Sequence, residues 1–186
     1  GEPYPAHYSY AYSKRMVDVQ IHAYKQQYNT NFCSVIPGNI FGENDNFNLE
    51  DGHVVPSLVH KCYNAKKNGT PLEVWGDGSA YREFLYAKDV ARVCIQLLES
   101  DVELPRRVIV SGQEETQIKD LVKLVCDAYD YHNVKWLTDK PNGQLRRPTN
   151  KEVFHKILPD FVYTDLSEAM KKTVTWFEQT YPNVRL

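Results

Sequence analysis

Apolar residues recur along this chain at two spacings, one typical of helices and one typical of strands. Residues 9–28 repeat apolar side chains at helical intervals without an internal Gly or Pro, and the β-rich run 32–36 stops at Pro37-Gly38-Asn39. The first segment is predicted to be a helix, and the second a buried strand that ends in a loop. The same spacings predict helices at about 54–68, 89–98, 118–129 and 166–181, and strands at 72–75, 82–86, 107–111 and 134–137. Strands and helices that alternate at these lengths indicate an α/β architecture.

Polar segments separate the predicted elements. Residues 42–52 form one long loop and residues from about 138 to 160 are mostly loop, and long loops in compact domains often carry function. The segment 76–79 (Gly-Asp-Gly-Ser) is predicted to turn between two strands. Asp89 is expected to cap the helix that follows it, because Asp is a favoured N-cap residue.

Composition narrows the functional classes. Hydrophobic residues make up 42% of the chain and charged residues 25%, and a net charge of −2 gives no overall attraction to nucleic acid or an anionic membrane. The four cysteines lack zinc spacing, and Cys94 and Cys126 lie in apolar helical patterns, so buried reduced thiols are expected. No apolar run reaches the length of a membrane span, and the polar first residues do not read as a signal peptide. These features predict a cytoplasmic protein with no nucleic-acid or membrane partner.

Tyr10 and Lys14 lie four positions apart, on one face of the first predicted helix. An ammonium beside a phenol favours its ionised form, which suits proton donation to a carbonyl under reduction. Tyr63/Lys67 and Tyr131/Lys135 have the same spacing, and chance alone supplies about one such match in a chain of this composition. The plainer interpretation of any one pair is an exposed tyrosine packed on a lysine stem.

Several short motifs in a fixed order are more specific than any single pair. They are Tyr10-x-x-x-Lys14, Pro37-Gly38-Asn39-Ile40-Phe41-Gly42, Asp45-Asn46-Phe47, Gly52-His53-Val54-Val55-Pro56, Val74-Trp75-Gly76-Asp77-Gly78, Arg82-Glu83-Phe84-Leu85-Tyr86 and Asp89-Val90-Ala91. Together they resemble the extended short-chain dehydrogenase/reductase superfamily. Within it the chain is most similar to the GDP-L-fucose synthase family of NADPH-dependent GDP-4-keto-6-deoxymannose 3,5-epimerase/4-reductases. The resemblance runs over essentially the whole chain and selects Tyr10 and Lys14 from the three pairs.

The resemblance implies the C-terminal part of such an enzyme. Residues 1–42 would hold the last helix and strand of a Rossmann domain, and residues 43–186 mainly a small α/β substrate-binding domain, with about 82–112 returning to the Rossmann sheet. Neither Gly-x-Gly-x-x-Gly nor Gly-x-x-Gly-x-x-Gly, the motifs that cradle a dinucleotide pyrophosphate, is present. We therefore expect this chain alone to bind NADPH poorly and to be inactive as an isolated fragment.

The resemblance assigns catalytic roles to three residues. Tyr10 would protonate the oxygen at carbon 4 of the keto-sugar as hydride arrives, and Lys14 would favour its ionised form and hydrogen-bond the nicotinamide ribose. His53 would act as acid and base at carbons 3 and 5 with a cysteine that none of the four cysteines here matches. Without the resemblance, His53 reads as a structural or surface histidine.

Two sets of binding residues are also implied by the resemblance. The cofactor set is Tyr10, Lys14, Pro37, Asn39, Ile40 and His53, and the substrate set is Asn39, Asn46, Lys61, Trp75, Arg82 and Arg147. A diphosphate requires cationic groups that converge from separate elements, which suits the lysine and the two arginines. The plainer alternatives are solvated charges, a core tryptophan and asparagines that satisfy local turns.

Two positions depart from the family pattern, and other functions stay open. Glu43-Asn44 stands where the family has Pro-His, which leaves the shape of that loop open, and Asn142 replaces an aspartate, which removes a carboxylate from the substrate side. The alternatives are a nucleotide-sugar binding module, a dimerisation unit without catalysis, or another nucleotide-sugar epimerase or dehydratase. A family-like homodimer would bury the helix face that bears Met16, Val19 and Ala23 against a second copy.

Overall fold

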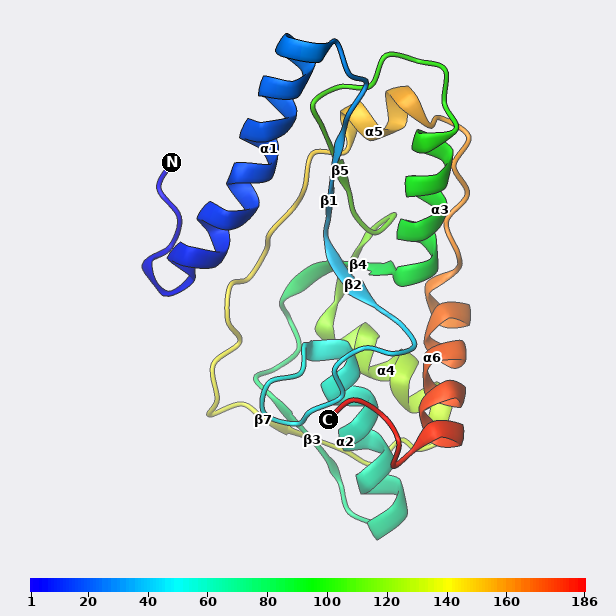
Figure 1. Cartoon of the computed structure of the whole chain (residues 1–186). Helices are drawn as coiled ribbons and strands as arrows, with labels where there is room; N and C mark the ends of the chain where they lie inside the picture. The colour runs from blue at the N-terminus through cyan, green and yellow to red at the C-terminus, as the bar shows by residue number, and fades with distance from the viewer.

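A computed structural model describes all of residues 1–186 as an elongated molecule of short strands surrounded by helices (Figure 1). The helices are the 3-10 turn η1 (Pro5–His7), α1 (Tyr8–Tyr28), α2 (Val54–Asn68), α3 (Ala87–Leu98), α4 (Ile118–Tyr129), α5 (Glu152–Ile157) and α6 (Leu166–Thr180). The strands are β1 (Ser34–Pro37), β2 (Asn39–Phe41), β3 (Leu72–Trp75), β4 (Tyr81–Tyr86), β5 (Arg107–Val110), β6 (Glu115–Gln117) and β7 (Val134–Leu137).

The strands pair in three small sheets, and most partners are distant in the sequence. β1 pairs with β5, β2 with β4 and β3 with β7, all in parallel, whereas β6 pairs antiparallel with β4. The turn 76–79 therefore joins two strands of different sheets. Because parallel partners require crossover connections, helices lie between them in the sequence, which confirms the predicted α/β architecture.

The larger core lies where α2, α4 and α6 pack together below β4 (Figure 1). Each helix turns a regular apolar stripe inward: Leu121, Val122 and Val125 of α4 are each no more than 2% exposed. Phe47, from the loop before α2, inserts into this core against Phe177, with ring centroids 4.8 Å apart. That contact fixes the loop before α2 on the body of the molecule.

A smaller core lies around β5, between α3 and α5. It contains seven buried residues, among them Val108 and Val110 of β5, Val93 and Leu97 of α3, and Phe154 of α5. Leu85 of β4 belongs to this core, whereas Phe84 and Tyr86 on either side belong to the larger one. Alternate side chains of β4 therefore join the two cores.

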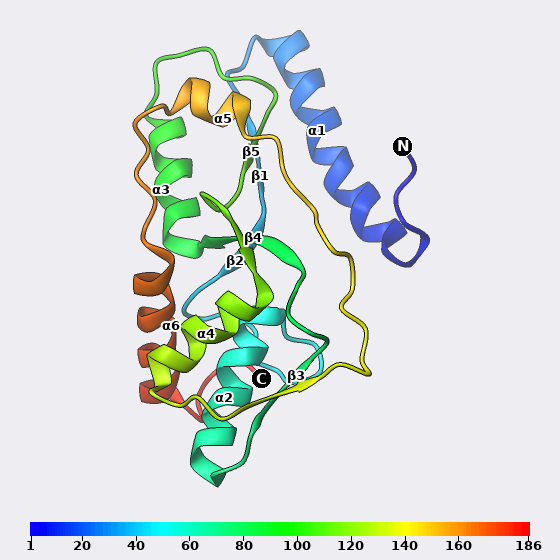
Figure 2. The same ribbon diagram turned by 180° about the vertical axis from the view of Figure 1, so that it is seen from behind.

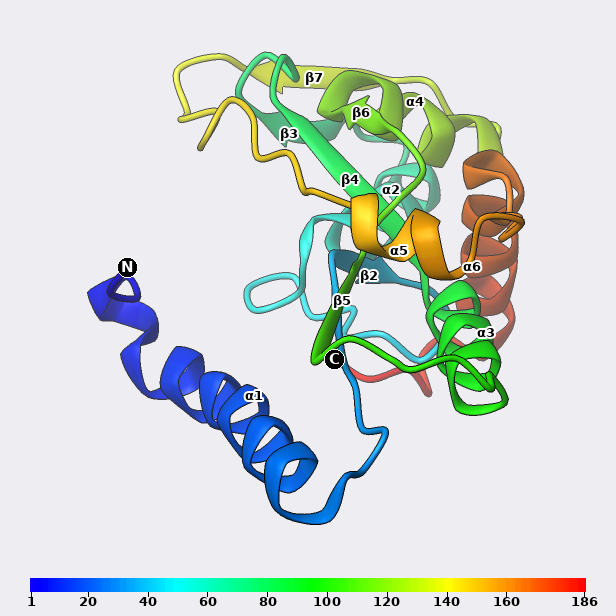
Figure 3. The same cartoon turned by 90° about the horizontal axis from the view of Figure 1, so that it is seen from above.

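α1 stands apart from both cores, as Figure 3 shows. None of its 21 residues is buried. Asp18 forms ion pairs with Arg106 at 2.8 Å and Arg107 at 3.6 Å, and Lys25 donates to the carbonyl of Leu104 at 2.7 Å. α1 is thus held mainly by polar contacts in its middle and C-terminal parts.

The predicted helices and strands are confirmed with small shifts of their ends, but four short elements were missed, one of them the 3-10 turn η1 ahead of α1. β2 and β6 lie in segments predicted as loop or left unassigned, and α5 lies within the long predicted loop. Each is six residues or fewer, and the strands depend on their pairing with β4 rather than on a local pattern.

Three local predictions were wrong. The run 32–36 was predicted to be a buried strand, but Phe32 is 49% exposed and Ile36, in β1, is 42% exposed. Asp89 lies inside the first turn of α3 and not at its N-cap, which is Tyr86, and its buried carboxylate binds another part of the chain. Cys94 is exposed, because α3 turns Val93 and Leu97 inward and leaves the next position on its outer face. All four cysteines are free thiols, and Cys62 and Cys126 are the buried ones.

Candidate functional site

A cleft of about 310 Å³ lies where α2, β3 and β4 meet the segment that follows β7. α2 lines it with one helical face, at positions 54, 57, 58 and 61, and β3 and β4 supply the facing wall. Three of the predicted substrate residues, Lys61, Trp75 and Arg82, are in its lining. The structure thus brings together side chains from three separate elements.

Two cationic side chains line this cleft without a carboxylate partner. Lys61 comes from α2, and Arg82 comes from β4, where its guanidinium donates to the carbonyl of Tyr81 at 2.6 Å. Glu73, the acidic residue of the lining, is paired instead with Lys135 at 2.8 Å. Both cations are therefore available for charge-assisted hydrogen bonds to an anion in the cleft.

Trp75 and Asn142 complete the side of the cleft at the end of β3. Trp75 is 60% exposed, so it is not the core tryptophan of the plainer interpretation, and its ring offers a flat apolar surface beside the cations. Asn142 accepts a hydrogen bond from the backbone N–H of Asp77 at 2.8 Å through its side-chain oxygen. That bond holds the turn after β3 against the segment after β7, and the departure from aspartate keeps the same acceptor.

The other predicted substrate residues lie outside the lining of this cleft. Arg147 lies exposed on the segment after β7, where its neighbour Arg146 binds both carboxylate oxygens of Glu115 at 2.9 and 2.8 Å. Asn46 accepts from the backbone N–H of Asn48 at 3.2 Å, which is the local turn role expected of an asparagine. The structure does not bring these two side chains to Lys61 and Arg82.

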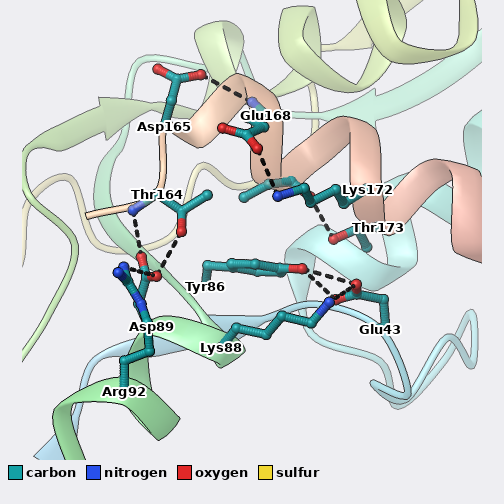
Figure 4. Close-up of polar contacts among 11 residues, drawn as sticks. Glu43, Tyr86, Lys88, Asp89, Arg92, Thr164, Asp165, Glu168, Lys172 and Thr173 are labelled. Atoms are coloured by element: carbon teal, nitrogen blue, oxygen red, sulfur yellow. Dashed lines mark hydrogen bonds and ion pairs between the residues drawn. The ribbon is translucent and has the colours of Figure 1, made fainter. Parts of the chain in front are cut away.

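The loop 42–53 begins at a charged cluster shown in Figure 4. The two carboxylate oxygens of Glu43 accept from the hydroxyl of Tyr86 at 2.9 and 2.8 Å, and one accepts from Lys88 at 2.8 Å. Burial works against ionisation of Glu43, but the hydrogen bonds from Lys88 and Tyr86 outweigh it, so its pKa is held below the usual value. Glu43, which stands where the family has proline, therefore anchors the start of the loop through its side chain.

Phe47 anchors the middle of the same loop. Its backbone N–H donates to the carbonyl of Arg185 at 2.8 Å, and its own carbonyl lies 2.8 Å from Nδ1 of the buried His60 of α2. Further along, Asn48 accepts from the backbone N–H groups of Glu50 and Asp51 at 2.7 and 2.9 Å. The loop is thus ordered by hydrogen bonds along most of its length.

His53 lies exposed at the end of this loop, in the N-cap position of α2. Its carbonyl accepts from the backbone N–H of Ser57 at 3.0 Å, and its ring makes no cap hydrogen bond. Burial raises the pKa of the nearby Asp45, and the field of His53 is among the effects that oppose the rise. His53 is next to Gly52 and Val54, which both line the cleft, so its backbone is fixed at the edge of that cleft.

Tyr10 and Lys14 lie on α1, which contributes no residue to the cleft. Tyr10 is 66% exposed, and the Lys14 ammonium lies 5.7 Å from the centre of its ring. Lys67 has the same relation to Tyr63, at 5.9 Å, so geometry within the chain does not distinguish the two pairs. In the third pair the groups turn elsewhere, Tyr131 to the carbonyl of Thr70 and Lys135 to Glu73.

The remaining predicted cofactor residues form one short segment. Pro37 ends β1, and Asn39 and Ile40 open β2, all three with exposed side chains. Asn39 donates through its amide to the carbonyl of Glu83 at 2.8 Å. Gly38 packs so closely on Ser111 that an added Cβ would lie 2.2 Å from its hydroxyl oxygen, which explains the glycine there.

A second cleft, of about 280 Å³, lies between β4 and the N-terminal end of α6. Its lining includes Asp89, Glu114 and Asp165 and no lysine or arginine. Asp89 is fully used within the protein: it accepts from the backbone N–H of Thr164 at 2.9 Å, from its hydroxyl at 2.7 Å and from Arg92 at 2.7 Å (Figure 4). Asp89 therefore ties α3 to the segment before α6.

No group of three or more His, Cys, Asp or Glu side chains is placed to hold a metal ion. None of the helices combines the length and the apolar character that spanning a membrane requires.

The α/β fold and the motifs along the chain are those of a known class of protein. The sequence model of the NAD dependent epimerase/dehydratase family matches residues 1–112, and the chain belongs to that family. Its relatives include the GDP-L-fucose synthase of Dictyostelium discoideum, 36% identical over 187 residues, and the probable GDP-L-fucose synthase of Drosophila melanogaster, 33% identical over 195 residues. Both alignments cover 100% of this chain but only 58% and 60% of the relatives.

Solved structures give the same result. The GDP-L-fucose synthetase of Naegleria fowleri is 35% identical and superposes with a TM-score of 0.92 over 100% of this chain and 59% of its own. The same enzyme bound to NADP has a TM-score of 0.91. A UDP-N-acetylglucosamine 4-epimerase from Methanobrevibacter ruminantium, at 24% identity and a TM-score of 0.75, shares the fold. The resemblance predicted from the motifs is confirmed over the whole chain, which spans about three fifths of the length of these relatives.

Proposed function

We propose that this chain is the substrate-binding part of an NADPH-dependent GDP-4-keto-6-deoxymannose 3,5-epimerase/4-reductase, which makes GDP-L-fucose. The observation that carries the proposal is the cleft in which Lys61, Arg82 and Trp75 come together. The place of Trp75 and Arg82 in the family motifs and the whole-chain similarity to GDP-L-fucose synthases support it.

In this proposal each wall of the cleft recognises one part of the substrate. Arg82 and Lys61 bind the diphosphate, because two cations from separate elements can hold its oxygens from two sides. Trp75 packs on the apolar face of the guanosine. A volume of about 310 Å³ is at the small end of ligand pockets, so the cleft fits part of a nucleotide sugar and leaves the rest outside it.

The catalytic roles are proposals of the same kind. Tyr10 protonates oxygen 4 of the keto-sugar, Lys14 stabilises its ionised form, and His53 moves protons at carbons 3 and 5. When bound, NADPH supplies the hydride. Pro37, Asn39 and Ile40 are exposed residues where β1 passes into β2 and are assigned to the nicotinamide end, and no residues of this chain form a glycine-rich cradle for the pyrophosphate.

The proposed division of the chain follows the family pattern. Residues 1–42 belong to the Rossmann domain and residues 43–186 mainly to the substrate domain, with about 82–112 returning to the Rossmann sheet. The parallel pairing of β1 with β5, across more than 70 positions, supports the return of that segment. The smaller core around β5 supports it too, since it is separate from the core behind the cleft.

We also propose a cytoplasmic homodimer. Four free cysteines support the compartment, because reduced thiols persist in the cytosol. The exposed helix α1 supports the dimer: Met16 and Val19 are 51% and 49% exposed on a helix without a buried residue, and burial against a second copy would remove that apolar area from water.

Calorimetry with GDP tests the substrate cleft directly. The variants Arg82→Ala and Arg107→Ala are compared in the natural protein that contains this chain. Arg107 is the matched control, because it is an exposed strand arginine outside the cleft. We expect Arg82→Ala to weaken GDP binding at least about tenfold, since a charge-assisted hydrogen bond contributes about 1.5–3 kcal/mol, and Arg107→Ala to bind normally.

The alternatives give different results in the same assays. If GDP does not bind even to the unaltered protein, the cleft is no nucleotide site and a dimerisation unit is favoured. Exchange of hydrogen at carbons 3 and 5 of the keto-sugar separates the proposed activity from other nucleotide-sugar epimerases or dehydratases. The variant His53→Gln is expected to lose that exchange while it retains reduction, and unchanged exchange would contradict the role of His53.

A further inference from the structure

The segment 138–151, called the strap here, crosses the molecule from β7 to α5 without forming a helix or strand (Figure 2). Most of its side chains are exposed, so packing alone does not hold it. It is attached to the body at separate points: Asn142 to the turn after β3, the carbonyl of Leu145 to the N–H of Tyr81 at 2.8 Å, and Arg146 to Glu115. The attachments at Asn142 and Tyr81 lie beside the cleft, because Asn142 lines it and Tyr81 lies between two lining residues of the chain.

The last residue of the strap makes a dense set of contacts. The ammonium of Lys151 lies 2.9 Å from a carboxylate oxygen of Glu83, 2.6 Å from the carbonyl of Gly112 and 3.0 Å from the carbonyl of Gln113. All three of its N–H donors therefore have acceptors. Lys151 and Glu83 are only 14% and 6% exposed, in contrast to the other lysine–carboxylate pairs of the chain, in which the lysine is largely exposed.

The strap reaches Glu83 a second time through Thr149, whose hydroxyl donates to the other carboxylate oxygen. Both oxygens of Glu83 are thus bound by residues of the strap. Burial works against ionisation of this carboxylate, but Thr149 and Lys151 outweigh it and hold its pKa below the usual value. Gly112, whose carbonyl accepts from Lys151, packs closely on β4. A Cβ added at Gly112 would lie 2.2 Å from the carbonyl oxygen of Phe84.

Glu83 sits on β4 between residues that the proposed site uses. Neighbouring residues of a strand point to opposite faces, so Glu83 takes the strap on one face while Arg82 lines the cleft on the other. The backbone carbonyl of Glu83 accepts the amide of Asn39 from the proposed nicotinamide segment. The carboxylate of Glu83 thus joins the strap to a strand whose next side chain, Arg82, lines the cleft and whose backbone binds Asn39.

We propose that Lys151 is a positioning residue for the nucleotide-sugar site: through Glu83 it fixes β4 under Arg82 and holds the strap, with Asn142, closed along the cleft. The inference rests on the proposed function for the identity of the ligand. It adds that the affinity for the diphosphate depends on a buried ion pair that lies outside the cleft. Lys151 touches neither cleft nor ligand, so its effect passes through Glu83 and the strap.

The test compares Lys151→Met with Lys156→Met in the natural protein that contains this chain. Lys156 is the matched control, because it lies five positions away and pairs with Glu152 at the surface. Limited trypsin digestion at the Arg146–Arg147 bond reports the strap, and calorimetry with GDP reports the site. We expect Lys151→Met to raise the cleavage rate and weaken GDP binding about tenfold each, and Lys156→Met to change neither more than about twofold.

Kinetics separate positioning from general damage. With GDP-keto-sugar and NADPH, Lys151→Met is expected to raise KM about tenfold with kcat within about twofold, because the chemical groups are untouched. Lys151→Arg, which keeps the charge, is expected to restore most of the affinity. Should Lys151→Met not fold, Thr149→Val removes the second contact to Glu83 and is expected to give about threefold changes of the same sign.

Each contrary result is distinct. Faster cleavage with unchanged GDP affinity would make Lys151 a structural tether only and overturn the proposal. Unchanged cleavage and unchanged affinity would overturn it as well. If Lys151→Met is cleaved faster but the unaltered protein does not bind GDP, the proposed function is wrong. The positioning role depends on that function and would then be wrong as well.

Discussion

α1 and α4 both repeat apolar residues at helical spacing, yet the protein uses them in opposite ways. α4 buries five of its twelve residues between α2 and α6, whereas α1 buries none of its 21. Hydrophobic contacts hold α4, and an ion-pair cluster with a lysine–carbonyl bond holds α1. The difference shows that periodicity predicts a helix and its apolar face, but does not predict whether the partner of that face lies in the same chain.

Matched truncations in the two helices should show the largest effect. Leu121→Ala in α4 is expected to cost about 2–5 kcal/mol of unfolding free energy, because Leu121 is 0% exposed and its removal leaves a cavity. Val19→Ala in α1 should cost no more than about 0.5 kcal/mol, because Val19 is 49% exposed. Urea denaturation of the two variants measures both values.

Repeating the denaturation of both variants at several protein concentrations sharpens the comparison of α1 with α4. In a homodimer through α1, the cost of Val19→Ala would rise as the concentration favours the dimer, whereas the cost of Leu121→Ala would persist at every concentration. Equal costs for the two variants at the lowest concentration would contradict the view that α1 has no partner within the chain.

Acid should weaken the body of the protein through Glu43, an effect of intermediate size. The folded protein lowers the pKa of Glu43 below the ordinary value of 4.5, so its stabilising contribution is present above that value. The contribution is lost as the pH falls through the folded-state pKa. Urea midpoints measured between pH 3 and 7 should therefore fall less steeply at acid pH in Glu43→Gln than in the unaltered protein.

Glu50→Gln is the control for this measurement, because Glu50 is an exposed carboxylate of the same loop without a salt bridge. Its pH dependence should follow that of the unaltered protein. Equal slopes for Glu43→Gln and the unaltered protein would show that the contacts with Tyr86 and Lys88 do not favour the ionised carboxylate.

Only small effects on stability should come from the two tyrosine–lysine pairs of equal geometry. Lys14→Met in α1 and Lys67→Met in α2 should each cost no more than about 1 kcal/mol, because exposed cation–π contacts are weak. Activity should separate them: with the proposed role of Lys14, only Lys14→Met abolishes keto-sugar reduction. Equal activity of both variants would contradict that role.

Much of the fold follows from local pattern, and its failures share a cause. Long periodic segments such as α2 and α4 were predicted closely. β2 and β6 were missed because three-residue strands exist only through their pairing with β4. Asp89 was misplaced because its true partner, Thr164, lies 75 positions away in the sequence.

The candidate site was predictable to a similar extent. The resemblance assigned Lys61, Trp75 and Arg82 to the substrate, and the structure gathers them in one cleft, but it also assigned Arg147, which lies outside the lining. Lys151 and Glu83 were not singled out, because a charged residue in a sequence gives no sign that it is buried or satisfied. The one available signal was the place of Glu83 directly after Arg82 on a predicted strand.

The attachment of α1 has a mechanical consequence for Tyr10. The helix ends at Asn29, which takes a left-handed conformation with φ of 52°, and the side chain of Asn31 bonds the backbone of Val102 and Leu104. Tyr10 lies roughly 27 Å from that junction at 1.5 Å per residue, so a rotation of about 10° there moves it by roughly 5 Å. The position of the Tyr10 phenol therefore depends on residues far from it: Asn29 and Asn31 set the direction of α1, and the ion pairs of Asp18 resist its rotation.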